Sequence, residues 1–109
     1  MTLSVVVGLG RSGIGAARLL KAQGSEVVVL EKAENVACTR KSADLRQQGI
    51  DVQLGQPLEI SSFEPWIDEI DQVVISPGIA WTHPTLEALR TRGVPVKGEM
   101  ALAWETLKK

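Results

Sequence analysis

The chain has 109 residues, a formal net charge of −1 at pH 7, 44% hydrophobic residues and 23% charged residues. Its length predicts a single domain, residues 1–109, with a hydrophobic core of ordinary size. The near-neutral charge excludes binding driven by attraction to nucleic acid or to an anionic membrane, so neither partner is expected.

The first third of the chain predicts two strands with a helix between them. Residues 3–7 are apolar and β-branched, as in a strand, and residues 12–23 repeat apolar side chains at helical spacing, with Ser12 as the expected N-cap. Residues 26–30 contain an unbroken apolar run. Such a run is typical of a strand covered on both faces, as in a parallel sheet.

The middle of the chain is less regular. Residues 31–39 are polar and are predicted to be a loop, and residues 41–48 are predicted to be a helix. Residues 50–54 alternate between apolar and polar side chains, which indicates a strand nearer the edge of the sheet. Two prolines interrupt residues 55–71, where we expect one short amphipathic segment.

The last third returns to regular alternation. Residues 72–76 and 94–98 predict two further strands, joined by a helix that begins at Thr82 or His83 and has Pro84 in its first turn. Together these elements predict an α/β fold with a doubly wound, mainly parallel five-stranded sheet and helices on both faces.

A final helix is predicted from Glu99, an acidic residue suited to a helix N-terminus. Its apolar face would consist of Met100, Ala103, Trp104 and Leu107. The chain ends at Lys108 and Lys109 with neither a glycine cap nor a tail, and we therefore expect it to be part of a longer protein. No secretion signal and no stretch of ~18 apolar residues is present, so a cytoplasmic location is expected.

A glycine-rich turn joins the first strand to the first helix. Gly8, Gly10 and Gly13 have the spacing G-x-G-x-x-G, with a strand before it and a helix after it. The first N–H groups of a helix lack internal partners and its dipole favours negative charge, so this turn predicts an anion site. Arg11 and Ser12 stand where they could also contact a phosphate. The alternative is a glycine-rich turn that binds nothing.

Two other strand ends carry candidate binding residues, because ligands of open α/β sheets bind outside the carboxyl ends of the strands. Glu31 and Lys32 follow the second strand, and a carboxylate about twenty residues past the glycines can accept bonds from a ribose hydroxyl or a base edge. Ser76, Pro77 and Gly78 follow the fourth strand and predict a sharp turn whose backbone can contact a ligand. A solvated loop acid and a simple turn are the alternatives.

The sequence contains no recognisable catalytic centre. It has no G-x-x-x-x-G-K-[ST] phosphate loop, and its one histidine and one cysteine, His83 and Cys38, cannot form a zinc site. We interpret His83 as a helix-start residue, and Cys38 as a thiol without function that fits a reducing compartment. The residues alone predict a nucleotide- or dinucleotide-binding domain with no catalytic and no metal-binding residue.

Two motifs together resemble the N-terminal domain of the Mur ligases, in particular the members that add D-glutamate. One is the glycine motif with its strand, residues 5–13, and the other runs from Val74 to Ala80 through the Ser-Pro-Gly turn and is followed by His83 and Pro84. Residues 96–100 resemble the segment that leads to the family's central domain. The resemblance therefore covers essentially the whole chain.

This resemblance implies a Rossmann-like domain that binds the UDP moiety of UDP-N-acetylmuramoyl-L-alanine during cytoplasmic synthesis of peptidoglycan precursors. The residues that it assigns to UDP binding are Gly10, Arg11, Ser12, Gly13, Glu31, Lys32, Ser76, Pro77 and Gly78. The family often has an aspartate followed by threonine and arginine near the uracil, where this chain has Glu31, Lys32 and Ala33. The longer carboxylate and the changed position of the positive charge bear on how this chain would recognise uracil.

The resemblance also implies that the chemistry takes place elsewhere. In the family, ATP phosphorylates the alanyl carboxylate, and the amine of D-glutamate attacks the acyl phosphate. The groups that bind ATP and magnesium belong to a central domain, and the D-glutamate site belongs to a C-terminal domain. We therefore expect this chain to hold no cofactor, to be inactive alone, and to have the UDP-linked substrate and the remaining domains of its own chain as partners.

Two other functions stay open. One is the NAD(P)-binding domain of an oxidoreductase or a redox-sensing regulator, in which Glu31 would bind a ribose diol. The other is a structural or interaction module whose nucleotide site is vestigial. The turn at Ser76, Pro77 and Gly78 favours the ligase domain over both.

Overall fold

A parallel sheet forms the centre of the protein, in a computed structural model that describes residues 2–99 and 101–102, with only the backbone of residues 11 and 12. Its strands are β1 (Leu3–Val7), β2 (Glu26–Leu30), β3 (Asp51–Gln53), β4 (Gln72–Ile75) and β5 (Val96–Gly98). They lie in the order β3-β2-β1-β4-β5, and every neighbouring pair is parallel. The predicted five-stranded fold is confirmed, with β3 at one edge.

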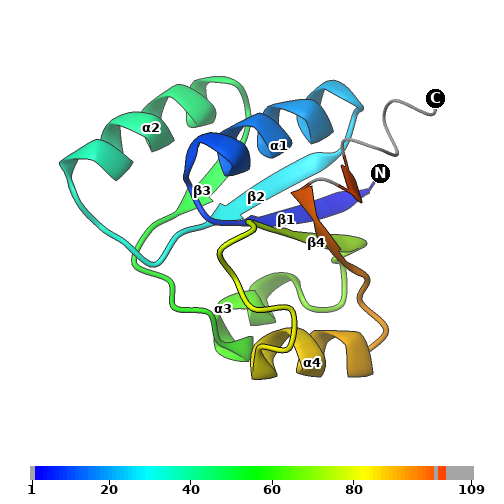
Figure 1. Ribbon diagram of the computed structural model, residues 1–109. Coiled ribbons are helices and arrows are strands. Elements are labelled where there is room, and N and C mark those ends of the chain that lie inside the picture. The colour runs from blue at the N-terminus through cyan, green and yellow to red at the C-terminus, as the bar shows by residue number, and fades with distance from the viewer. Residues whose placement is uncertain (1, 100, 103–109) are drawn as a thin grey trace.

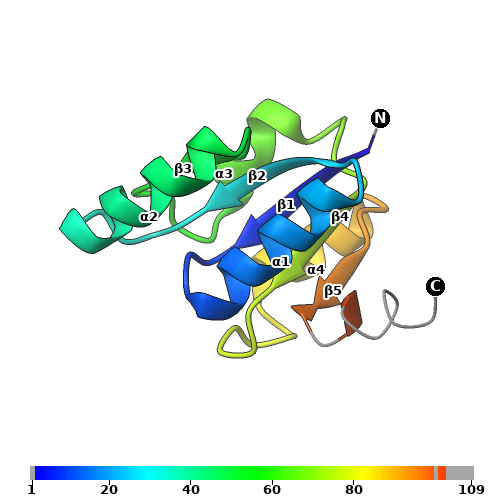
Figure 2. The same cartoon turned by 90° about the horizontal axis from the view of Figure 1, so that it is seen from above.

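Helices cover both faces of this sheet, as the unbroken apolar strands predicted. Helices α1 (Arg11–Ala22) and α2 (Val36–Gln47) lie on one face, and α3 (Ile60–Phe63) and α4 (Pro84–Thr91) lie on the other (Figure 1). Seen from above, α1 and α2 run along the strands (Figure 2). A 3-10 turn, η1 (Glu64–Trp66), follows α3 in the region where one short segment was expected.

Alternate side chains of β1 divide the core into two layers, because successive residues of a strand point to opposite faces. Val5 packs in one cluster with Phe63 of α3 and Leu89 of α4. Val6 packs in the other cluster with Leu45 of α2. Among the described residues, no helix has the length and apolar character that crossing a membrane requires.

The predicted loop at residues 31–39 is wrong in its second half, because α2 begins at Val36 rather than near residue 41. The Asn35 side chain accepts a hydrogen bond from the backbone N–H of Cys38 at 2.9 Å and so caps the helix. The helix buries only three residues. Its apolar periodicity was therefore too weak to reveal the first turn.

The predicted fifth strand is too long, because β5 begins at Val96. Pro95 has no N–H to donate to the sheet, although its carbonyl oxygen accepts from Val73 at 2.9 Å. Glu99, Ala101 and Leu102 are helical, as a last helix predicted. The other residues assigned to that end lie outside the described residues: Met100, Ala103, Trp104, Leu107, Lys108 and Lys109.

We predict that the substitution Leu89→Ala lowers the free energy of unfolding by about 2–5 kcal/mol, because the Leu89 side chain is fully buried between α4 and the sheet. Val36 is the matched control, since its side chain is 69% exposed. Val36→Ala should change the free energy by less than about 0.5 kcal/mol. Urea unfolding followed by circular dichroism measures both, and equal effects would contradict the assigned core.

Candidate functional site

A cleft of about 530 Å³ opens at the carboxyl edge of the sheet. The strand order reverses between β1 and β4, which is where open α/β sheets bind their ligands. The volume lies within the roughly 300–1,000 Å³ typical of small-molecule sites. The cleft is lined by Val7, Gly8, Leu9, Gly10, Gly13, Leu30, Glu31, Lys32, Gln56, Pro57, Leu58, Phe63, Ser76, Gly78, Ile79, Ala80 and His83.

The glycine loop brings the N-terminus of α1 to this cleft without a side-chain cap. Gly10, rather than the predicted Ser12, is the N-cap residue, and no side-chain hydrogen bond caps the helix. The first turn of α1 therefore keeps N–H groups for a ligand. A Cβ at Gly10 would meet no atom within 4 Å, so a ligand has room to approach the backbone of the loop.

Two other glycines give the loop its shape. Gly8 has φ +108°, a conformation that L side chains rarely adopt. A Cβ on Gly13 would collide with the backbone carbonyl oxygen of Gly8. The helix can therefore start this close to β1 only because Gly13 has no side chain, as the motif predicted.

The Glu31 carboxylate holds two loops together. One oxygen accepts a hydrogen bond from the backbone N–H of Leu9 at 2.8 Å, and the other accepts from the N–H of Ala33 at 2.9 Å. The sequence predicted a carboxylate available to a ribose hydroxyl or a base edge. Both oxygens are instead engaged with backbone, and each keeps one further lone-pair site for a ligand.

The turn after β4 lies beside the glycine loop and lines the same cleft. A Cβ at Gly8 would lie only 3.4 Å from the Ser76 hydroxyl oxygen, so the two loops pack closely. The Ser76 carbonyl oxygen accepts from the N–H of Ile79 at 3.1 Å and closes the turn. Gly78 lines the cleft, whereas Pro77 is exposed and lies outside the lining residues.

The structure thus brings most of the predicted binding residues to one cleft: Gly10, Gly13, Glu31, Lys32, Ser76 and Gly78. Arg11 and Ser12 begin α1 directly after Gly10, and their backbone alone is described. Lys32 is exposed, and among the described lining residues it carries the one positive charge. The described residues contain no group of His, Cys, Asp or Glu side chains that could hold a metal ion.

The loop after β3 forms a wall of the cleft that the sequence analysis missed. Gln56, Pro57 and Leu58 line the cleft, and the N–H of Gln56 donates to the Glu31 carbonyl oxygen at 2.9 Å. The signal was available, because this loop follows the carboxyl end of a parallel strand. It was overlooked because the strand before the loop, β3, is short and lies at the edge of the sheet.

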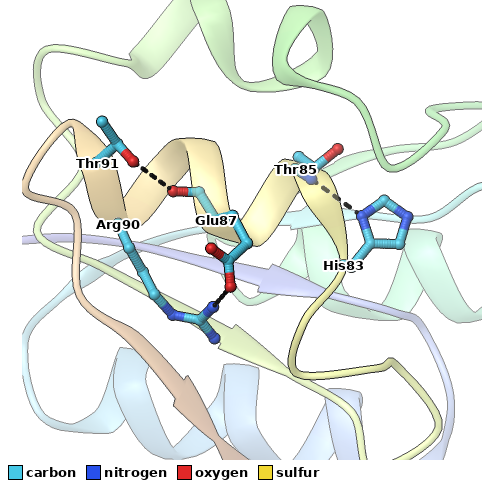
Figure 3. Close-up of polar contacts among 5 residues, drawn as sticks. All are labelled: His83, Thr85, Glu87, Arg90 and Thr91. Carbon is cyan, nitrogen blue, oxygen red and sulfur yellow. Dashed lines mark hydrogen bonds and ion pairs between the residues drawn. The ribbon is translucent and has the colours of Figure 1, made fainter.

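His83 caps α4, as predicted, and also lines the cleft, which was not predicted. Its Nδ1 accepts a hydrogen bond from the backbone N–H of Thr85 at 3.1 Å (Figure 3). Trp81 lies outside the lining residues. Its ring packs against the guanidinium of Arg90 at 4.2 Å, and Arg90 also pairs with Glu87 at 3.5 Å.

Comparison with known proteins identifies related sequences. A family model described as Mur ligase MurD-like, N-terminal domain, matches residues 2–98. The chain is 62% identical over 107 residues to the UDP-N-acetylmuramoylalanine–D-glutamate ligase of Prochlorococcus marinus, and the match covers 98% of this chain and 23% of that protein. The chain therefore spans about a quarter of the length of that relative.

Solved structures share the fold across different activities. The UDP-N-acetylmuramate-alanine ligase MurC of Thermotoga maritima superimposes with a TM-score of 0.70 and 25% identity, over 99% of this chain and 23% of that chain. Saccharopine dehydrogenase of Saccharomyces cerevisiae superimposes with a TM-score of 0.66 and 17% identity, over 90% of this chain and 21% of that chain. A ligase and a dehydrogenase thus share this fold, and the fold alone does not select the ligand.

We predict that Gly13→Ala destabilises the chain by about 1–3 kcal/mol, because the new Cβ must displace the Gly8 carbonyl group. Gly15→Ala is the matched control in the same helix. A Cβ at Gly15 meets no atom within 4 Å, so alanine should stabilise the chain by about 0.5–1 kcal/mol. Thermal unfolding of both variants measures these changes in stability. An unchanged stability in Gly13→Ala would refute the close contact between Gly13 and the Gly8 carbonyl group.

We also predict that Glu31→Gln costs about 1–3 kcal/mol and speeds hydrogen exchange at the amides of Leu9 and Ala33. A glutamine can accept from one of these N–H groups through its oxygen, while its NH₂ group opposes the other. Glu34→Gln is the control, because the Glu34 side chain is exposed and, among the described residues, the N–H groups of Leu9 and Ala33 bond to Glu31 and not to Glu34. Unchanged exchange at Leu9 in Glu31→Gln would rule out this connection between the loops.

Proposed function

This chain belongs to the MurD-like N-terminal domain family of the Mur ligases, and on that premise we propose that its cleft binds the UDP moiety of UDP-N-acetylmuramoyl-L-alanine. One observation carries the proposal. The uncapped N-terminus of α1 and the turn of Ser76 and Gly78 line the same cleft at the strand-order reversal. A phosphate-bearing ligand is the chemistry that such a helix N-terminus favours.

The diphosphate would lie against the first turn of α1. Gly10 leaves room for a phosphate to approach the backbone, and the N–H groups of the first turn point toward it. Lys32, at the rim of the cleft, supplies a positive charge to the same ligand. Arg11 and Ser12 follow Gly10 in the chain, and we assign them to the diphosphate on the family's pattern.

The uridine would extend toward the ends of β2 and β4. Glu31 and Lys32 lie on one side, and Ser76 and Gly78 lie on the other, with Pro77 fixing the turn. The Glu31 oxygens can accept a further bond only from a donor, such as a hydroxyl or a ring N–H. In this proposal, the hydrogen bond from the N–H of Leu9 to Glu31 keeps the glycine loop in the conformation that binds the phosphates.

We further propose that the parent protein is a cytoplasmic, ATP-dependent ligase that adds D-glutamate to this substrate in peptidoglycan synthesis. ATP and magnesium would bind to other domains of the parent, which are partners of this one. The residues of this chain do not fit those groups, because it has no phosphate loop of the G-x-x-x-x-G-K-[ST] type. We therefore assign no step of the ligation to this chain, and we expect it to be inactive alone.

Titration calorimetry with UDP and with NADH tests the proposal. We expect saturable binding of UDP and no binding of NADH at the same concentration, because the loops that define this family select the UDP-linked substrate. Binding of NADH without binding of UDP would contradict the proposal and support a dinucleotide domain instead.

Lys32→Ala is a second arm of the same experiment. Loss of a charged contact to phosphate should weaken UDP binding about tenfold. The matched control is Lys41→Ala, which removes an equal charge from the exposed surface of α2. An equal loss of affinity in both variants would mean that Lys32 acts only through net charge.

A further inference from the structure

We propose that Thr85 is a positioning residue for the cleft, because its hydroxyl holds in place the wall that the loop after β3 contributes. The inference rests on the proposed function and deepens it, since it assigns a part in UDP binding to a residue outside the cleft lining. Three observations carry it: the hydrogen bonds of Thr85, the irregular backbone of the wall, and the connection of the wall to Glu31.

Thr85 is bonded through both its backbone and its side chain. Its N–H donates to Nδ1 of His83 at 3.1 Å, which fixes the residue at the start of α4 (Figure 3). Its hydroxyl donates to the carbonyl oxygen of Leu58 at 2.8 Å, 27 residues earlier in the chain. Thr85 is 8% exposed, so water has little access to compete for this hydrogen bond.

The wall that this bond holds has no regular secondary structure. Gln56, Pro57 and Leu58 line the cleft, and they lie between β3 and α3 in the chain. The carbonyl oxygens of such a loop lack the partners that a helix or a sheet supplies. Two buried hydroxyls act as donors here: Thr85 bonds to Leu58, and Ser62 of α3 donates to the Pro57 carbonyl oxygen at 2.7 Å. The conformation of the wall therefore depends on side chains from α3 and α4.

The other end of the wall is connected to the glycine loop. The N–H of Gln56 donates to the carbonyl oxygen of Glu31 at 2.9 Å, and the Glu31 carboxylate accepts from the N–H of Leu9 at 2.8 Å. The first turn of α4 is thus joined through the wall to the loop before α1. Loops that are already ordered lose less conformational entropy when a ligand binds. Thr85 therefore strengthens UDP binding without contacting the ligand.

The variant Thr85→Val tests the role of the hydroxyl, because valine has a similar shape but cannot donate to Leu58. We expect it to bind UDP about fivefold to tenfold more weakly in titration calorimetry. Thr85→Ser returns the hydroxyl and should restore the affinity to within about twofold of the unaltered chain. Equal affinities of Thr85→Val and the unaltered chain would overturn the inference.

The matched control is Thr91→Val, in the same helix. The Thr91 hydroxyl donates to the carbonyl oxygen of Glu87 at 2.9 Å, so this variant loses the same kind of hydrogen bond within α4 (Figure 3). Thr91 is exposed and lies outside the cleft lining, and Thr91→Val should bind UDP as the unaltered chain does. An equal loss of affinity in Thr91→Val and Thr85→Val would mean that Thr85 acts only through the stability of α4, and would overturn the inference.

Hydrogen exchange separates an effect on the wall from a general effect on the helix. In ligand-free Thr85→Val we expect faster exchange at the amides of Gln56 and Glu59, which donate to the Glu31 and Pro57 carbonyl oxygens. The amide of Glu87 donates to the His83 carbonyl oxygen and should exchange as before, since the helix cap does not use the Thr85 hydroxyl. Faster exchange at Glu87 alone would overturn the inference.

The outcomes separate this inference from the function on which it rests. No binding of UDP to the unaltered chain at millimolar concentration would overturn both. Undiminished UDP binding by a folded Thr85→Val variant would overturn the role of Thr85 and leave the proposed function intact. If Thr85→Val does not fold, Ser62→Ala replaces it, because it removes the other hydroxyl bond to the same wall. Weaker UDP binding by Ser62→Ala would support the positioning of the wall, and an unchanged affinity would overturn it.

Discussion

The open N-terminus of α1 is the feature on which the rest of the site depends. A helix start without a side-chain cap is unfavourable unless water or a ligand satisfies its N–H groups. Here Gly10 leaves it uncapped, Gly13 allows it to start beside β1, and Glu31 holds the N–H of Leu9 in the loop before it. The cleft then forms because the turn of Ser76 packs against the same loop.

The sequence predicted those parts of the fold in which one periodicity dominates. The valine-rich strands β1, β2 and β4 are buried on both faces, and their unbroken apolar runs revealed them. The sequence placed the start of α2 near residue 41 instead of at Val36. The start of this helix is marked by the Asn35 cap more than by an apolar face. The alternating residues 50–54 revealed the edge strand β3. The short helix α3 was anticipated only as one segment within residues 55–71, because its structure depends on neighbours that local patterns do not record.

The sequence predicted which backbone turns form the candidate site, but not the hydrogen bonds that connect them. Glycine spacing specified where the chain turns, so Gly10, Gly13 and Gly78 were found at the cleft. The engagement of Glu31 with Leu9 joins residues from different loops, which one sequence cannot reveal. The likeness to both a ligase and a dehydrogenase shows why the loops, rather than the sheet, must specify the ligand.

The central claim is that one nucleotide diphosphate contacts the start of α1 and the turn after β4 at the same time. Backbone amide chemical shifts recorded during a titration with UDP test it most directly. The account predicts that the amides of residues 10–13 and of Ser76, Gly78 and Ile79 shift together, with one dissociation constant, while those of α2 and the far ends of the strands stay unchanged. Shifts confined to one of the two loops, or spread over a different surface, would contradict it.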